Sequence, residues 1–117
     1  MTGSLAGLRC VPCRGGEPPL GSQEISGLLP ELPGWEVNEI MGIPRLVRVY
    51  KFKNFSQALE FTQKVGEIAE AEDHHPALLT EWGKVTVSWW THKIKGLHQN
   101  DFIMAAKTDR IYPLKME

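Results

Sequence analysis

The fold of this chain is decided by residues 78–91, which read LLTEWGKVTVSWWT. Two runs rich in β-branched and aromatic residues flank a Gly-Lys pair at 83–84, which has the length of a tight turn. In the second run Val85, Val87 and Trp89 alternate with polar residues, so their side chains share one face of a strand. The stretch therefore predicts a β-hairpin with one buried face.

A second pair of strands and a long helix precede this hairpin. Residues 35–40 and 46–52 alternate apolar and polar side chains, and the sequence MGIP separates them. Asn54 then offers a helix N-cap, with Gln57 three residues on, and the helix is expected to end near Glu72. Its apolar stripe at helical spacing consists of Phe55, Ala58, Leu59, Thr62, Val65, Gly66 and Ala69.

Two further helices bracket this pattern. The first runs over residues 22–32, with Ser22 as its N-cap and a Pro-Gly pair at its end, and the last runs over residues 98–111. The order α-β-β-α-β-β-α predicts an α+β fold, in which three helices pack on one face of a four-stranded antiparallel sheet. Trp89 and Trp90 point to opposite faces, so one of them needs cover from a partner chain or a ligand, or is a partly exposed side chain on a solvated face.

Composition bounds the class of protein. The chain has 117 residues and a net charge of −1, which suits one small domain and disfavours binding to nucleic acid or to an anionic membrane. The start of the sequence lacks the basic and apolar stretches of a signal peptide, so we expect a cytoplasmic protein. Residues 1–21 hold five of the 11 glycines and three of the eight prolines, which predicts a flexible N-terminal extension before a single domain at 22–117.

That extension carries both cysteines, Cys10 and Cys13, in a C-x-x-C pattern. One such motif supplies two of the four ligands of a structural zinc site, and a thioredoxin-like motif needs a strand before it and a helix after it. Three interpretations stay open: an incidental pair, a zinc site shared with another chain or a remote histidine, and redox chemistry.

Histidines and carboxylates gather at two places. The sequence EAEDHHP at 70–76 holds His74 and His75, His92 follows the last strand, and Asp101 begins the last helix. Histidine has an unperturbed pKa near ~6.5, so it can give or take a proton at neutral pH. Because the hairpin turn returns one strand beside the other, we expect the two places to meet at one end of the sheet. The residues fit a general acid/base site, a structural role at helix ends, or a metal site without the spacing of known motifs.

In order and spacing, the segment from Glu70 to Ala106 resembles the pterin-4a-carbinolamine dehydratase family. The resemblance rests on Glu70, the HHP run at 74–76, Thr91-His92, Gly96-Leu97 and Asp101, and it extends to Trp35-Glu36-Val37 and the FKNF helix entry at 52–55. It covers roughly residues 22–112, and bacterial members that serve phenylalanine hydroxylase are the most similar. What it implies is a lyase that removes water from 4a-hydroxytetrahydropterin and so recycles the cofactor of aromatic amino acid hydroxylases.

The resemblance also implies a site without metal or other cofactor. The family's catalytic histidines match His74, His75 and His92, and its supporting acids match Glu70 and Asp101. Its pocket tryptophan matches Trp35. We expect Asp101 to hold His92, and Glu70 to lie near His74.

The resemblance further implies assembly as a homodimer or homotetramer through the sheet edge and the long helix. Two other roles stay open: a protein-binding module that acts as a transcriptional coactivator, as in animal members, and a pterin-related role in molybdenum-cofactor metabolism. His98 stands where the family often has serine, at the start of the last helix.

Overall fold

The computed structural model describes residues 5, 7–11 and 18–112 of the chain; Cys13 lies outside them. The helices and strands of the described residues follow one another in the predicted order, with two short 3-10 helices added. In chain order they are α1 (Ser22–Leu28), the 3-10 helix η1 (Leu29–Glu31), β1 (Glu36–Ile40), β2 (Ile43–Lys51), α2 (Phe55–Glu72), β3 (Ala77–Glu81), β4 (Lys84–Trp89), the 3-10 helix η2 (His92–Ile94) and α3 (Gln99–Ile111).

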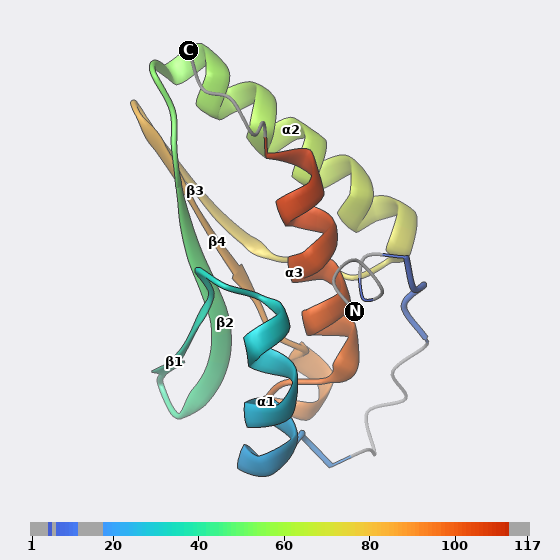
Figure 1. Cartoon of the computed structure of the whole chain (residues 1–117). Helices are drawn as coiled ribbons and strands as arrows, with labels where there is room; N and C mark the ends of the chain where they lie inside the picture. The colour runs from blue at the N-terminus through green and yellow to red at the C-terminus, as the bar shows by residue number, and fades with distance from the viewer. Residues whose placement is uncertain (1–4, 6, 12–17, 113–117) are drawn as a thin grey trace.

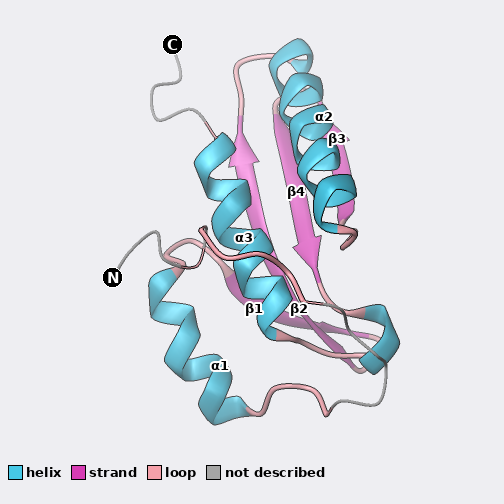
Figure 2. Ribbon diagram, turned by 90° about the vertical axis from the view of Figure 1, so that its right-hand side faces the viewer, coloured by secondary structure: helices cyan, strands magenta, loops and turns pink. Residues whose placement is uncertain are grey.

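The strands form one antiparallel sheet in the order β1-β2-β4-β3. In the described part of the chain, α1, α2 and α3 all lie on the same face of this sheet (Figures 1 and 2). Strand β4 runs in the middle, where Trp89 pairs with Leu46 of β2 and Thr86 pairs with Leu79 of β3. The predicted α+β fold is therefore confirmed.

The core lies between the sheet and the helices. It is built from alternate residues of the central strands and from inward faces of α2 and α3, because a strand presents every second side chain to the same layer. The side chain of Trp89 is fully buried, and its indole Nε1 donates a hydrogen bond to Thr108 Oγ1 of α3 at 3.1 Å. The one polar atom of this side chain therefore has a partner. Other buried members are Leu46, Tyr50, Ala58, Phe61, Val65, Ala69, Val85, Val87, Phe102 and Met104.

Helix α2 begins as its sequence predicts but buries a narrower stripe. The side chain of Asn54 accepts a hydrogen bond from the backbone N–H of Gln57 at 2.8 Å, which confirms the N-cap. Phe55 and Leu59 were expected in the apolar stripe, and they are 45% and 51% exposed. Phe61 is buried instead. The side chains that meet the sheet are those at 58, 61, 65 and 69, and the row that holds 55 and 59 lies beside them on the helix surface.

Trp90 obtains its cover from within the chain. Its side chain is only 8% exposed, the guanidinium of Arg45 lies 3.9 Å from its ring centroid, and the ring of His92 lies 4.5 Å from it. The cover that the sequence left to a partner or a ligand is thus supplied by a cation–π contact and a neighbouring imidazole.

The residues just before α1 pack against the turn that follows β4. The backbone N–H of Leu20 donates to the carbonyl of Leu97 at 2.8 Å, and a Cβ at Gly96 would lie 2.7 Å from Cβ of Pro19. Only glycine allows this close approach, so residues 18–20 help to fix the turn. No helix within residues 5, 7–11 and 18–112 is long and apolar enough to cross a membrane.

Candidate functional site

The histidine pair sits where α2 ends. Asp73 adopts the left-handed conformation at φ 54°, and the backbone N–H of His74 returns to the carbonyl of Ala69 at 3.1 Å. Asp tolerates this conformation better than most residues, and Pro76 disfavours further helix at His75. The chain therefore leaves α2 sharply, and the adjacent imidazoles of His74 and His75 make contact with different partners.

His74 is fixed by a buried carboxylate. Its Nε2 lies 2.6 Å from Asp101 Oδ1, and its ring is stacked on the Trp89 indole with the two planes 6° apart. Asp101 is fully buried at the start of α3, where its Oδ2 accepts hydrogen bonds from Thr91 Oγ1 at 2.8 Å and from the backbone N–H of His98 at 2.9 Å. The Nε2 atom of His74 is thus the ring nitrogen that faces Asp101, and Nδ1 is its second ring nitrogen.

His75 is paired on the exposed side of the same turn. Its Nε2 lies 2.6 Å from Glu70 Oε2, and the two side chains are 52% and 79% exposed. An exposed pair of this kind contributes little to stability, since both side chains are solvated and lose entropy on pairing. The contact with Glu70 instead orients the ring of His75.

His92 reaches the site from the other strand of the hairpin. It begins η2, in a turn closed by the backbone pair of Thr91 and Gly96, where Thr91 N–H donates to the Gly96 carbonyl at 2.9 Å. The side chain of His92 is exposed and packs against Trp90. The expectation that the two histidine positions meet at one end of the sheet agrees with this geometry.

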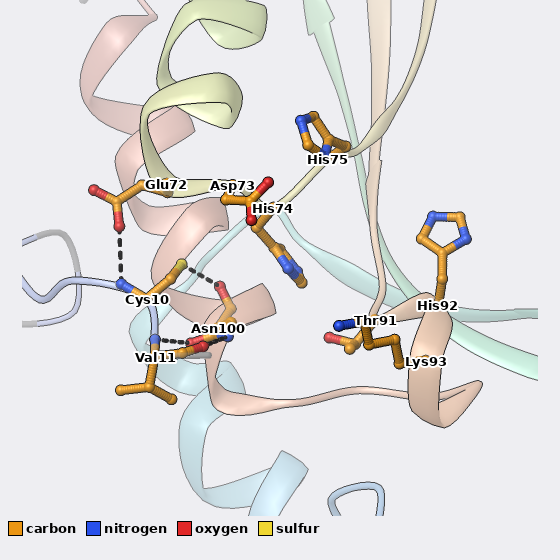
Figure 3. Close-up of a pocket in the computed structure, with 10 residues that line it drawn as sticks. All are labelled: Cys10, Val11, Glu72, Asp73, His74, His75, Thr91, His92, Lys93 and Asn100. Carbon is orange, nitrogen blue, oxygen red and sulfur yellow. Dashed lines mark hydrogen bonds between the residues drawn. The ribbon is translucent and has the colours of Figure 1, made fainter. Parts of the chain in front are cut away.

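These residues surround one cavity of about 420 Å³. Figure 3 shows His74, His75 and His92 arranged around it, with residues of the N-terminal segment on the opposite side. The lining consists of Cys10, Val11, Glu72, Asp73, His74, His75, Thr91, His92, Lys93 and Asn100. Among the described residues, no group of three or more His, Cys, Asp or Glu side chains is arranged to hold a metal ion.

The carboxylates pair differently from our expectation. Asp101 contacts His74 rather than His92, and Glu70 contacts His75 rather than His74. The reason is the turn at Asp73, which brings His74 to the first turn of α3 and leaves His75 beside the last turns of α2.

Trp35 lies outside this cavity lining. Its Nε1 donates to both carboxylate oxygens of Asp109 at 3.1 Å, and Arg48 Nη1 donates to the same carboxylate at 2.9 Å. The hydroxyl of Tyr50 also donates to Asp109. The structure thus brings the three histidines and Asp101 together and places Trp35 in a separate cluster between β2 and α3, so its role in substrate binding stays a prediction.

Cys10, Val11, Lys93 and Asn100 of the lining lie outside the site predicted from the sequence, and Glu72 lies within the predicted run at 70–76 without a predicted role of its own. Glu72 lies two positions from both Glu70 and His74, and its pKa is lowered, mainly by a hydrogen bond from the backbone N–H of Cys10. Burial raises the pKa of the Cys10 thiol to about 12, with a further contribution from the negative charge of Glu72. In the sequence, the one signal for these residues is their position: Glu72 lies between Glu70 and His74, and Asn100 is next to Asp101.

The comparisons with known proteins agree on one family. The family described as "Pterin 4 alpha carbinolamine dehydratase" matches residues 18–111. A relative from Microcystis aeruginosa, named for an inferred pterin-4-alpha-carbinolamine dehydratase activity, is 60% identical over 108 residues, which cover 92% of this chain and 93% of the relative. A relative from Gloeobacter violaceus with a name of the same kind is 57% identical over the same shares.

Solved structures show the same architecture. The crystal structure of a "transcriptional coactivator/pterin dehydratase" from Brucella melitensis is similar with a TM-score of 0.73 and 33% identity, covering 81% of this chain and 99% of that one. A "pterin dehydratase-like protein" described as a RuBisCO assembly factor of the alpha-carboxysome has a TM-score of 0.58 and 16% identity over 70% of this chain and 93% of that one, and it shows the fold alone.

Proposed function

This chain belongs to the pterin-4α-carbinolamine dehydratase family, and from that premise we propose that it dehydrates 4a-hydroxytetrahydropterin to quinonoid dihydropterin in the cytoplasm. The observation that carries the proposal is the cavity into which three histidines converge from the end of α2 and from η2. The reaction serves to recycle the pterin cofactor of an aromatic amino acid hydroxylase, such as phenylalanine hydroxylase.

The chemistry needs two proton transfers. The C4a–O bond breaks as the hydroxyl takes up a proton and leaves as water, N5 loses its proton, and a C4a=N5 double bond forms. A positioned imidazole contributes typically about 10²–10⁴-fold for each such transfer. Two imidazoles in opposite protonation states, on either side of the ring junction, therefore suffice without a cofactor.

We assign these transfers to His75 and His92, because both are exposed at the cavity and come from different elements. The Nε2 of His74 is engaged by Asp101, and its ring is stacked on Trp89, so it forms a fixed surface of the pocket. In this assignment Glu70 orients His75, and Asp101 orients His74.

A stopped-flow assay tests the proposal. The 4a-carbinolamine is generated in the flow cell, and its breakdown is followed with and without the protein, with the double variant His75→Ala/His92→Ala as the matched control. We expect wild type to accelerate the loss of water well above the uncatalysed rate and the double variant to give nearly none of this acceleration. Equal rates with and without wild type would contradict the proposal.

We also propose that the protein works as a homodimer or homotetramer. Val49 and Leu79 are 44% and 57% exposed on the strands, and they lie on the side chain row opposite to the one that meets the helices. Phe55 and Leu59 are similarly exposed on α2. Assembly would remove this apolar surface from water, which supports both the sheet and the long helix as contact regions.

A further inference from the structure

A strap formed by Arg9, Cys10 and Val11 crosses the end of α2 and reaches the cavity (Figures 1 and 3). Its first anchor is Glu72: one carboxylate oxygen accepts the backbone N–H of Cys10 at 2.9 Å, and the other accepts Arg9 Nε at 2.9 Å. Both oxygens of Glu72 are therefore engaged by residues that lie 62 and 63 positions earlier in the chain.

The second anchor is Asn100, a residue that is only 2% exposed. Its Oδ1 accepts the backbone N–H of Val11 at 3.0 Å, and its Nδ2 donates to the carbonyl of Val11 at 2.7 Å. A buried amide without partners is costly, and here both of its ends are satisfied by one residue of the strap. This pairing fixes the position of the strap along its own direction, which a single hydrogen bond would not do.

We propose that the strap Arg9–Val11 is a wall of the pterin pocket and that Glu72 and Asn100 are positioning residues that act on substrate affinity through it. The inference rests on the proposed function, since it concerns the same site. Cys10 and Val11 line the cavity together with their two anchors and the three histidines. The backbone N–H groups of Cys10 and Val11 are already engaged, so the strap meets one edge of the bicyclic ring by its shape rather than by donating from these groups.

The thiol of Cys10 fits a wall rather than a reacting group. Its pKa is raised to about 12, so it is a neutral thiol at pH 7, and a neutral thiol is neither the nucleophile nor the metal ligand that a reactive cysteine provides. Its Sγ lies 4.0 Å from the carbonyl oxygen of Asn100, beside the second anchor.

The first test compares full-length point variants in the stopped-flow assay. Glu72→Gln keeps the shape of the side chain and removes its charge, and Glu67→Gln, an exposed position of the same helix, is its matched control. Asn100→Ala is compared with Asn38→Ala on an exposed position of β1. We expect KM to rise about fivefold or more in the two anchor variants with kcat within about twofold, and neither parameter to change in the controls.

The second test needs no turnover. In a Cys13→Ser background Cys10 is the remaining thiol, and its slow alkylation by excess iodoacetamide is measured at pH 9, where a small fraction is thiolate, with and without 7,8-dihydrobiopterin. We expect the pterin to slow alkylation at least about threefold, because it occupies the cavity that Cys10 lines.

The outcomes separate the two proposals. Suppose that wild type dehydrates the carbinolamine, that the anchor variants have the KM of wild type, and that the pterin leaves alkylation unchanged. The strap then only fastens the chain; the proposal that it is a pocket wall is overturned, and the proposed function is not. If Asn100→Ala does not fold, Glu72→Gln and the alkylation measurement decide. If wild type shows no dehydration, the proposed function is overturned and the wall with it.

Discussion

Asp101 organises the site at the scale of single residues. This one buried carboxylate is hydrogen-bonded to the His74 imidazole, and it accepts hydrogen bonds from the Thr91 hydroxyl and the backbone N–H of His98. It therefore ties together the end of α2, the turn after β4 and the start of α3. His98 is the N-cap of that helix, where its Nδ1 accepts the backbone N–H of Asn100 at 3.0 Å.

The histidines are expected to act as a unit. Replacing His74, His75 or His92 by Ala should lower kcat/KM by more than ~10-fold each, and a double replacement should cost less than the product of the singles. His98→Ser is the control, since serine also caps helices well, and it should change activity little. Steady-state kinetics of the purified variants check this. Loss of activity in His98→Ser, with His75→Ala and His92→Ala fully active, would show that a different set of residues carries the reaction.

At the scale of elements, the sequence predicted helices and strands better than contacts between them. The hairpin at 78–91 and the Asn54 cap are local patterns, and both were predicted within a few residues. The partner of each carboxylate depends on the left-handed turn at Asp73, and the cover of Trp90 depends on Arg45 from another strand. Spacing along the chain does not report such geometry, because it is set by how α2, α3 and the sheet pack.

The strap gives α2 a pH-dependent contact. The pKa of Glu72 is lowered from 4.5 in the folded protein, chiefly by the backbone hydrogen bond from Cys10. A lowered pKa means that the stabilisation is present above the unfolded value and is lost as pH falls through the folded value. Wild type should thus exceed Glu72→Gln by about 1 kcal/mol in the free energy of unfolding at pH 7.

Urea unfolding at pH values from 3 to 7 measures this difference. We expect it to be constant down to about pH 5 and to shrink below pH 4.5, where the carboxylate of Glu72 takes up its proton. A difference that stayed the same at pH 3 would show that the charge of Glu72 does not hold the strap. Glu67→Gln, again the exposed control on the same helix, should show no such pH dependence.

At the scale of the whole molecule, exposed apolar side chains of the described residues lie at turns, as Met41 and Trp82 do, and on two regular elements of the fold. The face of the sheet opposite the helices exposes Val49 and Leu79, and α2 exposes Phe55 and Leu59. The adjacent tryptophans do not require a partner chain, because Trp90 is covered within the chain. The exposed side chains on these two regions now carry the expectation of assembly.

Light scattering at micromolar concentration should therefore give a mass of two or four times 13.2 kDa. Leu59→Glu should lower the mass if α2 forms a contact, because a charge would have to be buried there. Glu60→Gln, next to it on the same helix and 71% exposed in its side chain, is the control. A stable 13.2 kDa species for wild type would contradict the prediction.

The strap also sets an order of events in biosynthesis. Cys10 and Val11 leave the ribosome 62 and 89 residues before the side chains that hold them. Val11 cannot dock on a nascent chain that has not yet reached Asn100, and closing such long loops carries an entropy cost that only the assembled sheet and helices can offset. The contacts of Cys10 and Val11 with Glu72 and Asn100 therefore form late, and a chain interrupted before the last helix has histidines at the end of α2 but no closed pocket around them.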